Sequence, residues 1–175
     1  MKTKDYKIES GAAEDAAAIY ELYRAVAAFE GGLARTAEEI TPEYVEYFLH
    51  NSLQSGVVVI ARNCDDGKIV GEIHGYALGP KVFAHVLGEL TIAVHPEWQG
   101  AGVGKALFTN FMNLVRENRP DVLRVELIAR ESNRKAIEFY QKIGFEIEGK
   151  LRNRIRSVGG GFEADVPMAW LRDES

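Results

Sequence analysis

The stretch that decides the fold of this 175-residue chain is VHPEWQGAGVGKAL, residues 94–107. It follows a run typical of a strand, residues 89–94, which Pro96 ends because proline cannot donate to a β-ladder. After it, apolar residues recur at helical spacing from Val103 to Asn118. The glycines of this stretch are therefore expected between the end of a strand and the start of an amphipathic helix.

A glycine loop in this place can hold an anion. It turns backbone N–H groups toward one point, and the helix N-terminus adds a favourable charge term of about 0.3–1 kcal/mol. It is not a nucleotide P-loop, because Gln99 stands where the first glycine is required and Ala106 replaces the magnesium-binding hydroxyl. The Gly-x-Gly-x-x-Gly dinucleotide fingerprint is also absent. Taken alone, the loop fits a tight turn without a ligand equally well.

A second stretch, NRKAIEFYQKIGF, occupies residues 133–145. Together the two stretches resemble the paired motifs of the GCN5-related N-acetyltransferases. The first of these motifs is [Arg/Gln]-x-x-Gly-x-[Gly/Ala] after a strand, and the second is Asn-x-x-Ala-x-x-Phe-Tyr-x-x-x-Gly-Phe. Both occur here in the order and at the separation found in that family.

The rest of the chain alternates segments with strand and helix patterns. Strands are predicted at 6–10, 57–62, 69–78, 89–94, 122–129, 145–151 and 162–171, and helices at 15–26, after Thr41, from 103 and at 133–142. No linker interrupts this order, which predicts a single α+β domain over residues 1–175. The resemblance implies the acyl-CoA N-acyltransferase (GNAT) fold, with a mixed, mostly antiparallel central sheet and helices on both faces.

The composition of the chain limits the classes of partner that it is expected to bind. A formal net charge of -5 provides no broad cationic surface, so neither nucleic acid nor a membrane surface is predicted. The lone Cys64 excludes an internal disulfide, and the four histidines show no paired ligand spacing, so no metal is predicted. The N-terminus is polar and no segment is long and apolar enough to cross a bilayer, which predicts a soluble cytoplasmic protein.

The resemblance implies acetyl-CoA as co-substrate. The main chain of Ile92 and Val94 would then pair with the pantetheine, and a backbone N–H near Val94 would stabilise the oxyanion, while both side chains are expected in the core. The diphosphate would be held by Gln99, Gly100, Ala101, Gly102, Val103, Gly104 and Lys105. Asn133 would contact the pantetheine, although from the sequence alone it is a helix N-cap. Lys105 is equally consistent with an exposed first-turn lysine.

Two proton-transfer residues are also implied. Tyr140 matches the family tyrosine that donates a proton to the departing CoA thiolate, although a tyrosine here could also serve packing alone. The attacking amine must be neutral, so the site needs a base, directly or through water. Glu89, at the start of the strand before the loop, is the first candidate, and Glu72 and His74 on the preceding strand are the alternatives.

The acceptor is expected to be a primary amine on a small metabolite, such as an amino acid or a polyamine. The family's acceptor pocket would include residues 29–35, His74, Tyr76 and residues 152–156, whose arginines, with Arg35, could receive a carboxylate. A peptide or protein N-terminus as acceptor stays open, as does a regulatory module that binds acyl-CoA without turnover. The sequence also leaves open the use of acyl groups other than acetyl. The resemblance implies a homodimer as a possible assembly.

Overall fold

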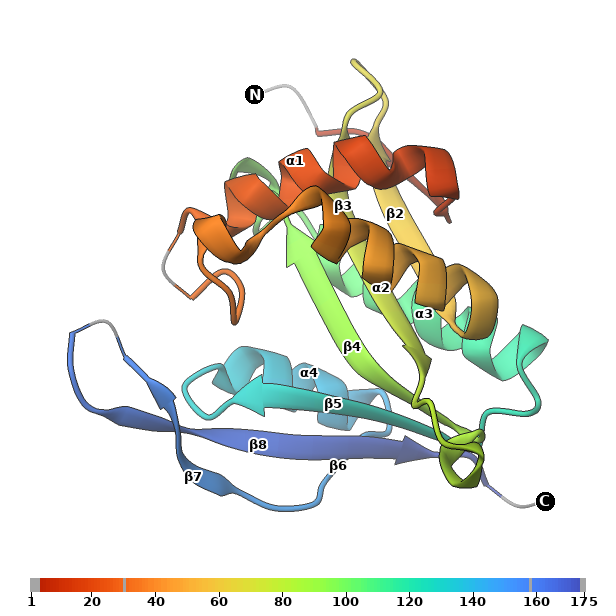
Figure 1. Ribbon diagram of the computed structural model, residues 1–175, viewed down its shortest axis with the longest axis vertical. Coiled ribbons are helices and arrows are strands. Elements are labelled where there is room, and N and C mark those ends of the chain that lie inside the picture. Colours follow the sequence, from red (N-terminus) through yellow and green to blue (C-terminus); the bar gives the residue numbers. More distant parts are fainter. Residues whose placement is uncertain (1–3, 30, 158, 174–175) are drawn as a thin grey trace. The chain divides into compact units, whose positions relative to one another are not determined.

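The computed structural model describes residues 4–29, 31–157 and 159–173 (Figure 1). These residues form two compact units. The first combines Met1–Ala77 with Thr91–Pro120, and the second combines Leu78–Leu90 with Asp121–Ser175. Strand β4, Val86–Val94, begins in the second unit and ends in the first. The single domain expected from the sequence stays a prediction.

The first unit contains the predicted N-terminal elements. Its strands are β1 (Tyr6–Ser10), β2 (Val57–Asn63) and β3 (Ile69–Ala77), and its helices are α1 (Ala16–Ala27), α2 (Pro42–Ser55) and α3 (Val103–Asn118). Strands β1 and β2 pair antiparallel, as do β2 and β3. The β2–β3 connection turns at Gly67, whose φ of +73° suits glycine, so the predicted hairpin is confirmed.

Helices cover both faces of these strands. A Cβ added to Gly71 on β3 would lie 2.7 Å from Leu107 and 2.8 Å from Val103, so this face of the strand packs closely against α3. The neighbouring residue, Glu72, points the other way and meets Tyr23 of α1. Figure 1 shows α1 and α2 in front of β2 and β3, with α3 behind them.

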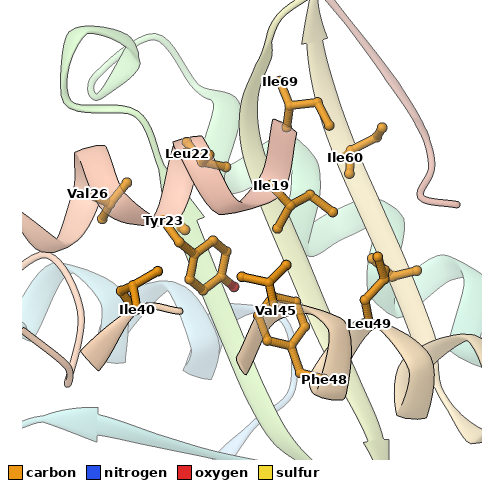
Figure 2. Packing of buried hydrophobic residues seen from close by; sticks show 12 residues of the cluster. Ile19, Leu22, Tyr23, Val26, Ile40, Val45, Phe48, Leu49, Ile60 and Ile69 are labelled. Carbon is orange, nitrogen blue, oxygen red and sulfur yellow. The ribbon is translucent and has the colours of Figure 1, made fainter. Parts of the chain in front are cut away.

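Helices α1 and α2 bury the stripes that their sequences predict. On α1 this stripe is Ile19, Leu22, Tyr23 and Val26, and it packs against Val45, Phe48 and Leu49 of α2 in one apolar cluster (Figure 2). Thr41 caps α2 through a 3.2 Å bond from the Tyr44 amide, and Pro42 takes the first helical position.

The apolar spacing of Val45, Phe48, Leu49 and Leu53 predicts Leu53 on the buried face of α2, and this prediction is wrong. The Leu53 side chain is 45% exposed, and Ser52 is buried in its place. The last buried residue of α2 is Ser52, one position before Leu53, so Leu53 lies outside the buried stripe of the helix. Ser52 is tolerated there because its hydroxyl donates to the Phe48 carbonyl at 2.7 Å.

The second unit is built on the long strand β8. It contains β5 (Arg124–Arg130), α4 (Arg134–Lys142), β6 (Glu146–Ile147), β7 (Leu151–Arg156), β8 (Phe162–Leu171) and the first part of β4. Strand β8 pairs antiparallel with β5, β6 and β7. Strand β4 runs parallel to β5, with Val86 opposite Arg124 and Leu87 opposite Val125. The mixed, mostly antiparallel pairing agrees with the predicted fold.

Two of the predicted strands differ most from the observed ones. Strand β4 begins at Val86 rather than at Glu89, because Gly88 is part of the strand instead of breaking it. A Cβ on Gly88 would lie 2.8 Å from Leu78 Cδ2, so the glycine serves close packing there. The strand predicted at 145–151 is divided into β6 and β7. The register of β7 on β8 shifts between Leu151 and Ile155, where Asn153 has a φ of +56°.

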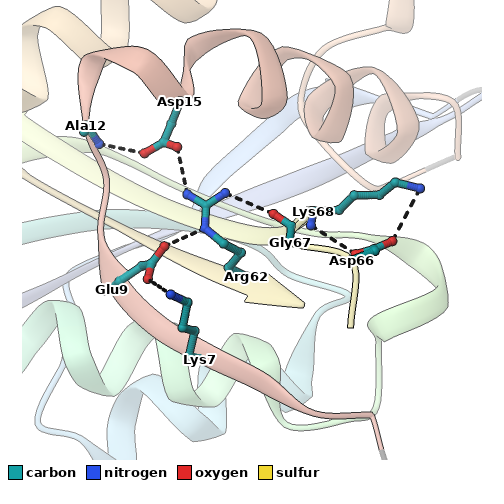
Figure 3. Close-up of polar contacts among 8 residues, drawn as sticks. All are labelled: Lys7, Glu9, Ala12, Asp15, Arg62, Asp66, Gly67 and Lys68. Carbon is teal, nitrogen blue, oxygen red and sulfur yellow. Dashed lines mark hydrogen bonds and ion pairs between the residues drawn. The ribbon is translucent and has the colours of Figure 1, made fainter. Parts of the chain in front are cut away.

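An ion-pair network fixes the start of α1 to the β1–β2 pair (Figure 3). The Arg62 guanidinium of β2 donates to Glu9 at 2.6 Å, to Asp15 at 2.9 Å and to the Gly67 carbonyl at 3.0 Å. Asp15 in turn accepts from the Ala12 amide at 2.9 Å. Such forked, charge-assisted bonds are stronger than an isolated surface pair, and the Arg62 side chain is only 25% exposed.

We expect Arg62→Leu to lower the free energy of unfolding by about 1–2 kcal/mol, because it removes several charge-assisted bonds at once. Arg62 and Lys7 lower the pKa of Glu9, so this stabilisation is present above the ordinary glutamate pKa of about 4.3 and is lost as pH falls below it. Denaturant unfolding at pH 7 and pH 3 measures both effects.

The matched control is Lys68→Ala, which removes the exposed pair between Lys68 and Asp66. Its effect should stay below about 0.5 kcal/mol, as for most exposed pairs. An Arg62→Leu loss that is the same at pH 3 as at pH 7 would contradict the electrostatic explanation.

Candidate active site

The glycine loop of the first unit takes the predicted place between β4 and α3. Gly100 and Gly102 have φ angles of +77° and +83°, a conformation that other residues adopt at a cost of about 1–2 kcal/mol. Gly102 is the residue before the first turn of α3, and Val103 begins the helix. The chain therefore reverses within the loop and enters the helix with its first amides exposed at one end.

The loop amides divide into bonded and unbonded groups. The Gln99 and Ala101 amides donate to Pro96 and Trp98 carbonyls, each at 3.3 Å. The Ala106 amide already bonds within the helix, to the Gly102 carbonyl at 3.0 Å. Within the described residues, no acceptor bonds the remaining amides of this stretch, which belong to Gly100, Gly102, Val103, Gly104 and Lys105. Unbonded amides at a helix N-terminus form an anion site.

The turn before the loop is held from several sides. The His95 Nδ1 accepts from the Glu97 amide at 3.3 Å, and the His95 amide donates to the Val70 carbonyl at 2.9 Å. Trp98 is buried and meets the Tyr6 ring edge-on at 6.2 Å. These contacts fix the loop through groups other than its unbonded amides. Lys105 is exposed in the first turn of α3, as expected for a surface lysine.

Ile92 and Val94 lie on β4 directly before this turn. Their side chains are half-buried rather than in the core, whereas Ala93 between them is 1% exposed. Both lie near Gly104, because a Cβ added there would be 3.6 Å from Val94 Cγ2 and 3.9 Å from Ile92 Cδ1. This is ordinary van der Waals contact, so a small side chain fits at residue 104.

Asn133 lies in the second unit and is the N-cap of α4. Its Oδ1 accepts from the Ala136 amide at 3.3 Å, so the capping role expected from the residue alone is confirmed. The side chain is exposed, and within the described residues no group bonds its Nδ2. Capping uses the oxygen, so the amide nitrogen can still donate to a ligand.

Tyr140 is half-buried on α4. Its ring lies 5.8 Å from the Phe139 ring and 6.2 Å from the Phe145 ring, measured between centroids. Burial raises the pKa of Tyr140 above the ordinary tyrosine value of about 10. The phenol therefore keeps its proton at neutral pH, as a proton donor must. The aromatic contacts show that the Tyr140 side chain takes part in packing.

Glu89 lies on the part of β4 that belongs to the second unit. Its side chain is exposed, and its φ of +51° is uncommon for a residue with a Cβ. The burial pattern of β4 changes here, because residues 86–88 are all buried and Glu89 is not. The Glu89 side chain is therefore exposed at the point where the burial of β4 changes.

The alternative bases, Glu72 and His74, are in the first unit and are almost completely buried. The Tyr23 hydroxyl donates to Glu72 at 2.5 Å, and His74 Nδ1 lies 3.1 Å from the same carboxylate. The sequence places Glu72 and His74 on one face of β3 but assigns Tyr23 only to the core. One signal could have connected Tyr23 with these two residues. Two polar residues share a face of a strand, and the apolar stripe of a helix that covers this face contains a tyrosine hydroxyl.

The arginines proposed for the acceptor have different surroundings. The Arg35 guanidinium lies 4.2 Å from the centroid of the Tyr44 ring, and Arg154 pairs with Asp165 at 3.1 Å. Arg156 lies over the Phe162 ring at 5.4 Å. Arg152 is exposed on β7, and the described residues include no partner for it. Residue 30, within the predicted 29–35 segment, lies outside the described residues.

Neither a metal site nor a membrane span is found in the part of the chain that the structure describes. No three His, Cys, Asp or Glu side chains there are grouped as metal ligands would be. None of the helices there combines the length and apolar character needed to cross a bilayer.

Comparison with known families and proteins shows what this chain is similar to. Residues 17–145 match the model of the Acetyltransferase (GNAT) family. Over 86 residues the chain is 35% identical to the L-amino acid N-acetyltransferase AaaT of Escherichia coli (strain K12). That alignment covers 49% of this chain and 52% of the relative, so the chain matches about half the length of this curated protein.

Solved structures share the fold over nearly the whole chain. An acetyltransferase of the GNAT family from Streptococcus pneumoniae superposes with a TM-score of 0.83 at 23% identity, covering 96% of this chain and 100% of its own. The putative acetyltransferase yncA from Salmonella typhimurium, solved with its cofactor acetyl-CoA, has a TM-score of 0.75 at 18% identity. That match covers 97% of this chain and 95% of yncA.

Proposed function

Because the chain belongs to the acetyltransferase (GNAT) family, we propose that it transfers the acetyl group of acetyl-CoA to a primary amine on a small metabolite by direct attack in a ternary complex. The observation that carries this proposal is the set of unbonded amides of Gly100, Gly102, Val103, Gly104 and Lys105. They match the need of a diphosphate for several N–H donors at one helix N-terminus.

The donor would be held by main-chain groups and one amide side chain. Gly100, Gly102, Val103, Gly104 and Lys105 would donate to the diphosphate. Gln99 and Ala101, whose amides are bonded within the turn, would shape the loop rather than donate. The main chain of Ile92 and Val94 would face the pantetheine, and Asn133 would donate to it through Nδ2.

The proton chemistry is assigned to Tyr140 and Glu89. Tyr140 would donate its proton to the departing thiolate, a role that its raised pKa supports because the phenol is protonated at the pH of the reaction. Glu89 would accept a proton from the attacking nitrogen, directly or through water, since its side chain is exposed on β4.

The acceptor class is an amino acid. The support is the 35% identity to an L-amino acid N-acetyltransferase, together with the exposed, unpaired guanidinium of Arg152 among the described residues, which could receive a carboxylate. Mass spectrometry of products from a panel of the L-amino acids, putrescine and short peptides identifies the acceptor. Peptides as the best acceptors by kcat/KM would favour a protein N-terminal acetyltransferase. CoA binding without any turnover would favour a binding module.

We expect Gly104→Asp to raise the Kd for CoA at least about tenfold, because a carboxylate at the helix N-terminus repels the diphosphate. The same carboxylate favours the helix by about 0.3–1 kcal/mol, so the variant should unfold at the same or a slightly higher temperature. Calorimetric titration with CoA and thermal unfolding measure the two quantities.

Gly104→Ala is the matched control for this loop substitution. Its methyl group makes only ordinary contacts with Val94 and Ile92, so CoA affinity should change little. If Gly104→Asp binds CoA as tightly as wild type while remaining folded, the diphosphate does not bind at this loop.

Tyr140→Phe should lower kcat by roughly 100-fold or more, because it removes the proton donor for the thiolate and keeps the ring packing. Its KM for acetyl-CoA should stay close to the wild-type value. Release of free thiol, followed with a chromogenic disulfide, measures the rate. Tyr47→Phe, which removes the hydroxyl of a tyrosine that is 64% exposed on α2, is the control and should leave kcat unchanged. An undiminished kcat in Tyr140→Phe would leave only packing for this residue.

A further inference from the structure

Three polar side chains meet inside the first unit, on the face of β3 that α1 and α2 cover. Tyr23 and Glu72 are completely buried and His74 is 2% exposed. The Tyr23 hydroxyl donates to Glu72 Oε2 at 2.5 Å, and His74 Nδ1 lies 3.1 Å from Oε1. We call Tyr23, Glu72 and His74 the buried triad.

One arrangement of protons satisfies the contacts of the buried triad. In this arrangement the Glu72 carboxylate accepts from both the Tyr23 hydroxyl and His74 Nδ1. Burial and the neighbouring Glu72 raise the pKa of Tyr23 well above its usual value, so it remains a donor. With its proton on Nδ1, a neutral imidazole has its lone pair on Nε2. Within the described residues, no group bonds His74 Nε2.

Packing holds the imidazole in one plane. The Phe48 ring of α2 stacks on the His74 ring with centroids 3.9 Å apart and an angle of 8° between the planes. Tyr76 stacks farther away, at 6.2 Å and 12°. The stacking fixes the ring plane, and Glu72 fixes its rotation within that plane. The direction of the Nε2 lone pair is therefore set by the fold.

Stability alone does not account for the buried triad. Taking a carboxylate out of water costs several kcal/mol, and apolar residues of similar volume often stabilise a core as well as a buried polar pair does. The surrounding cluster is otherwise built of apolar side chains such as Ile19, Val45 and Phe48. A carboxylate that orients an imidazole and leaves its far nitrogen unbonded is the arrangement of a general base.

Amine acetylation requires two deprotonations. A bound ammonium loses one proton before attack, and the attacking nitrogen loses another as the amide forms. One proton is returned to the thiolate of CoA and the other leaves to water. A base that takes the proton released during attack cannot hold the first proton as well, so the initial ammonium needs a further acceptor.

The geometry points to His74 as this acceptor, with Glu72 and Tyr23 as the positioning residues that orient it. An N–H bond of the ammonium breaks, its electron pair becomes the nucleophile, and the proton binds Nε2 and then passes to water. This role rests on the proposed function, because it needs an amine as acceptor. Imidazole suits the step because a neutral ring that is protonated on Nδ1 can accept a proton at Nε2.

His74→Asn tests the proposal, since asparagine can still donate to Glu72 but cannot accept the proton. With saturating acetyl-CoA and the best amine of the acceptor panel, kcat/KM for the amine should fall about 100-fold at pH 7. The loss should shrink below about tenfold above pH 9.5, where water already holds the free amine. CoA affinity should not change.

Glu72→Gln, which keeps the shape and removes the charge, is the second variant and should show the same pH-dependent loss. Ser52→Ala is the matched control, because it removes a buried hydrogen bond to Phe48 on the same side of the unit. It should lower stability without a pH-dependent change in rate. Two further titratable side chains lie beside the buried triad, Tyr44 next to Tyr23 and Tyr76 next to His74, and the Arg35 guanidinium lies over the Tyr44 ring.

A loss that is equal at every pH, or no loss in folded His74→Asn and Glu72→Gln proteins, overturns the proposal. Nitrogen-15 NMR of the wild-type imidazole tests the geometry without turnover and should show the proton of the neutral ring on Nδ1. A proton on Nε2 would contradict it. Wild-type protein that acetylates no amine overturns the proposed function and this role with it, and the NMR result separates that outcome from a wrong geometry.

Discussion

Every α-helix begins with four amides that have no acceptor within the helix, and a cap or a ligand must supply one. In α3, which follows Gly102 with its φ of +83°, the first amides are unbonded within the described residues. A residue with a Cβ would resist this conformation, and a normally capped helix would use its amides on a serine or aspartate side chain. Because Gly102 has no side chain to act as a cap, the donors stay available. The Trp98 and His95 contacts then support the loop from behind without using them.

Strand β3 shows how one element serves two requirements. On the side of α3 it carries Gly71, which lets Leu107 and Val103 approach the backbone. On the side of α1 and α2 it carries Glu72 and His74, which are buried and bonded to each other and to Tyr23. The alternation of a strand makes this possible, because adjacent residues point to opposite faces. A close-packed face and a polar face are thus held rigidly with respect to each other.

Much of the fold could be predicted from residues with a single strong preference. Thr41 and Pro42 place the start of α2, the apolar spacing of Ile19 and Leu22 defines the buried stripe of α1, and Gly144, with a φ of +101°, ends the segment after α4. The errors lie where a residue serves a contact that is distant in sequence. Gly88 has the sequence character of a strand breaker, yet it makes room for Leu78. The bulge at Asn153 depends on pairing with β8, which no local pattern specifies.

Parts of the candidate site could likewise be predicted from the sequence, and other parts could not. The loop and Asn133 could be found because their motifs are contiguous. The division of the loop amides into bonded and unbonded groups could not, since it depends on the carbonyls of Pro96 and Trp98. The buried triad could be predicted only in part, because Tyr23 and Glu72 are far apart in the sequence and a tyrosine within an apolar stripe is typical of a core residue.

The oxygen and the nitrogen of the Asn133 side chain place different limits on which residues can replace it. Its oxygen caps α4 and its nitrogen remains unbonded among the described residues. Serine, threonine and aspartate cap helices about as well as asparagine, so helix stability alone would let this position drift among them. None of these three offers an amide N–H in the same place. If the nitrogen has a function, related chains that keep the activity should retain asparagine there, while chains that have lost it should accumulate the other caps.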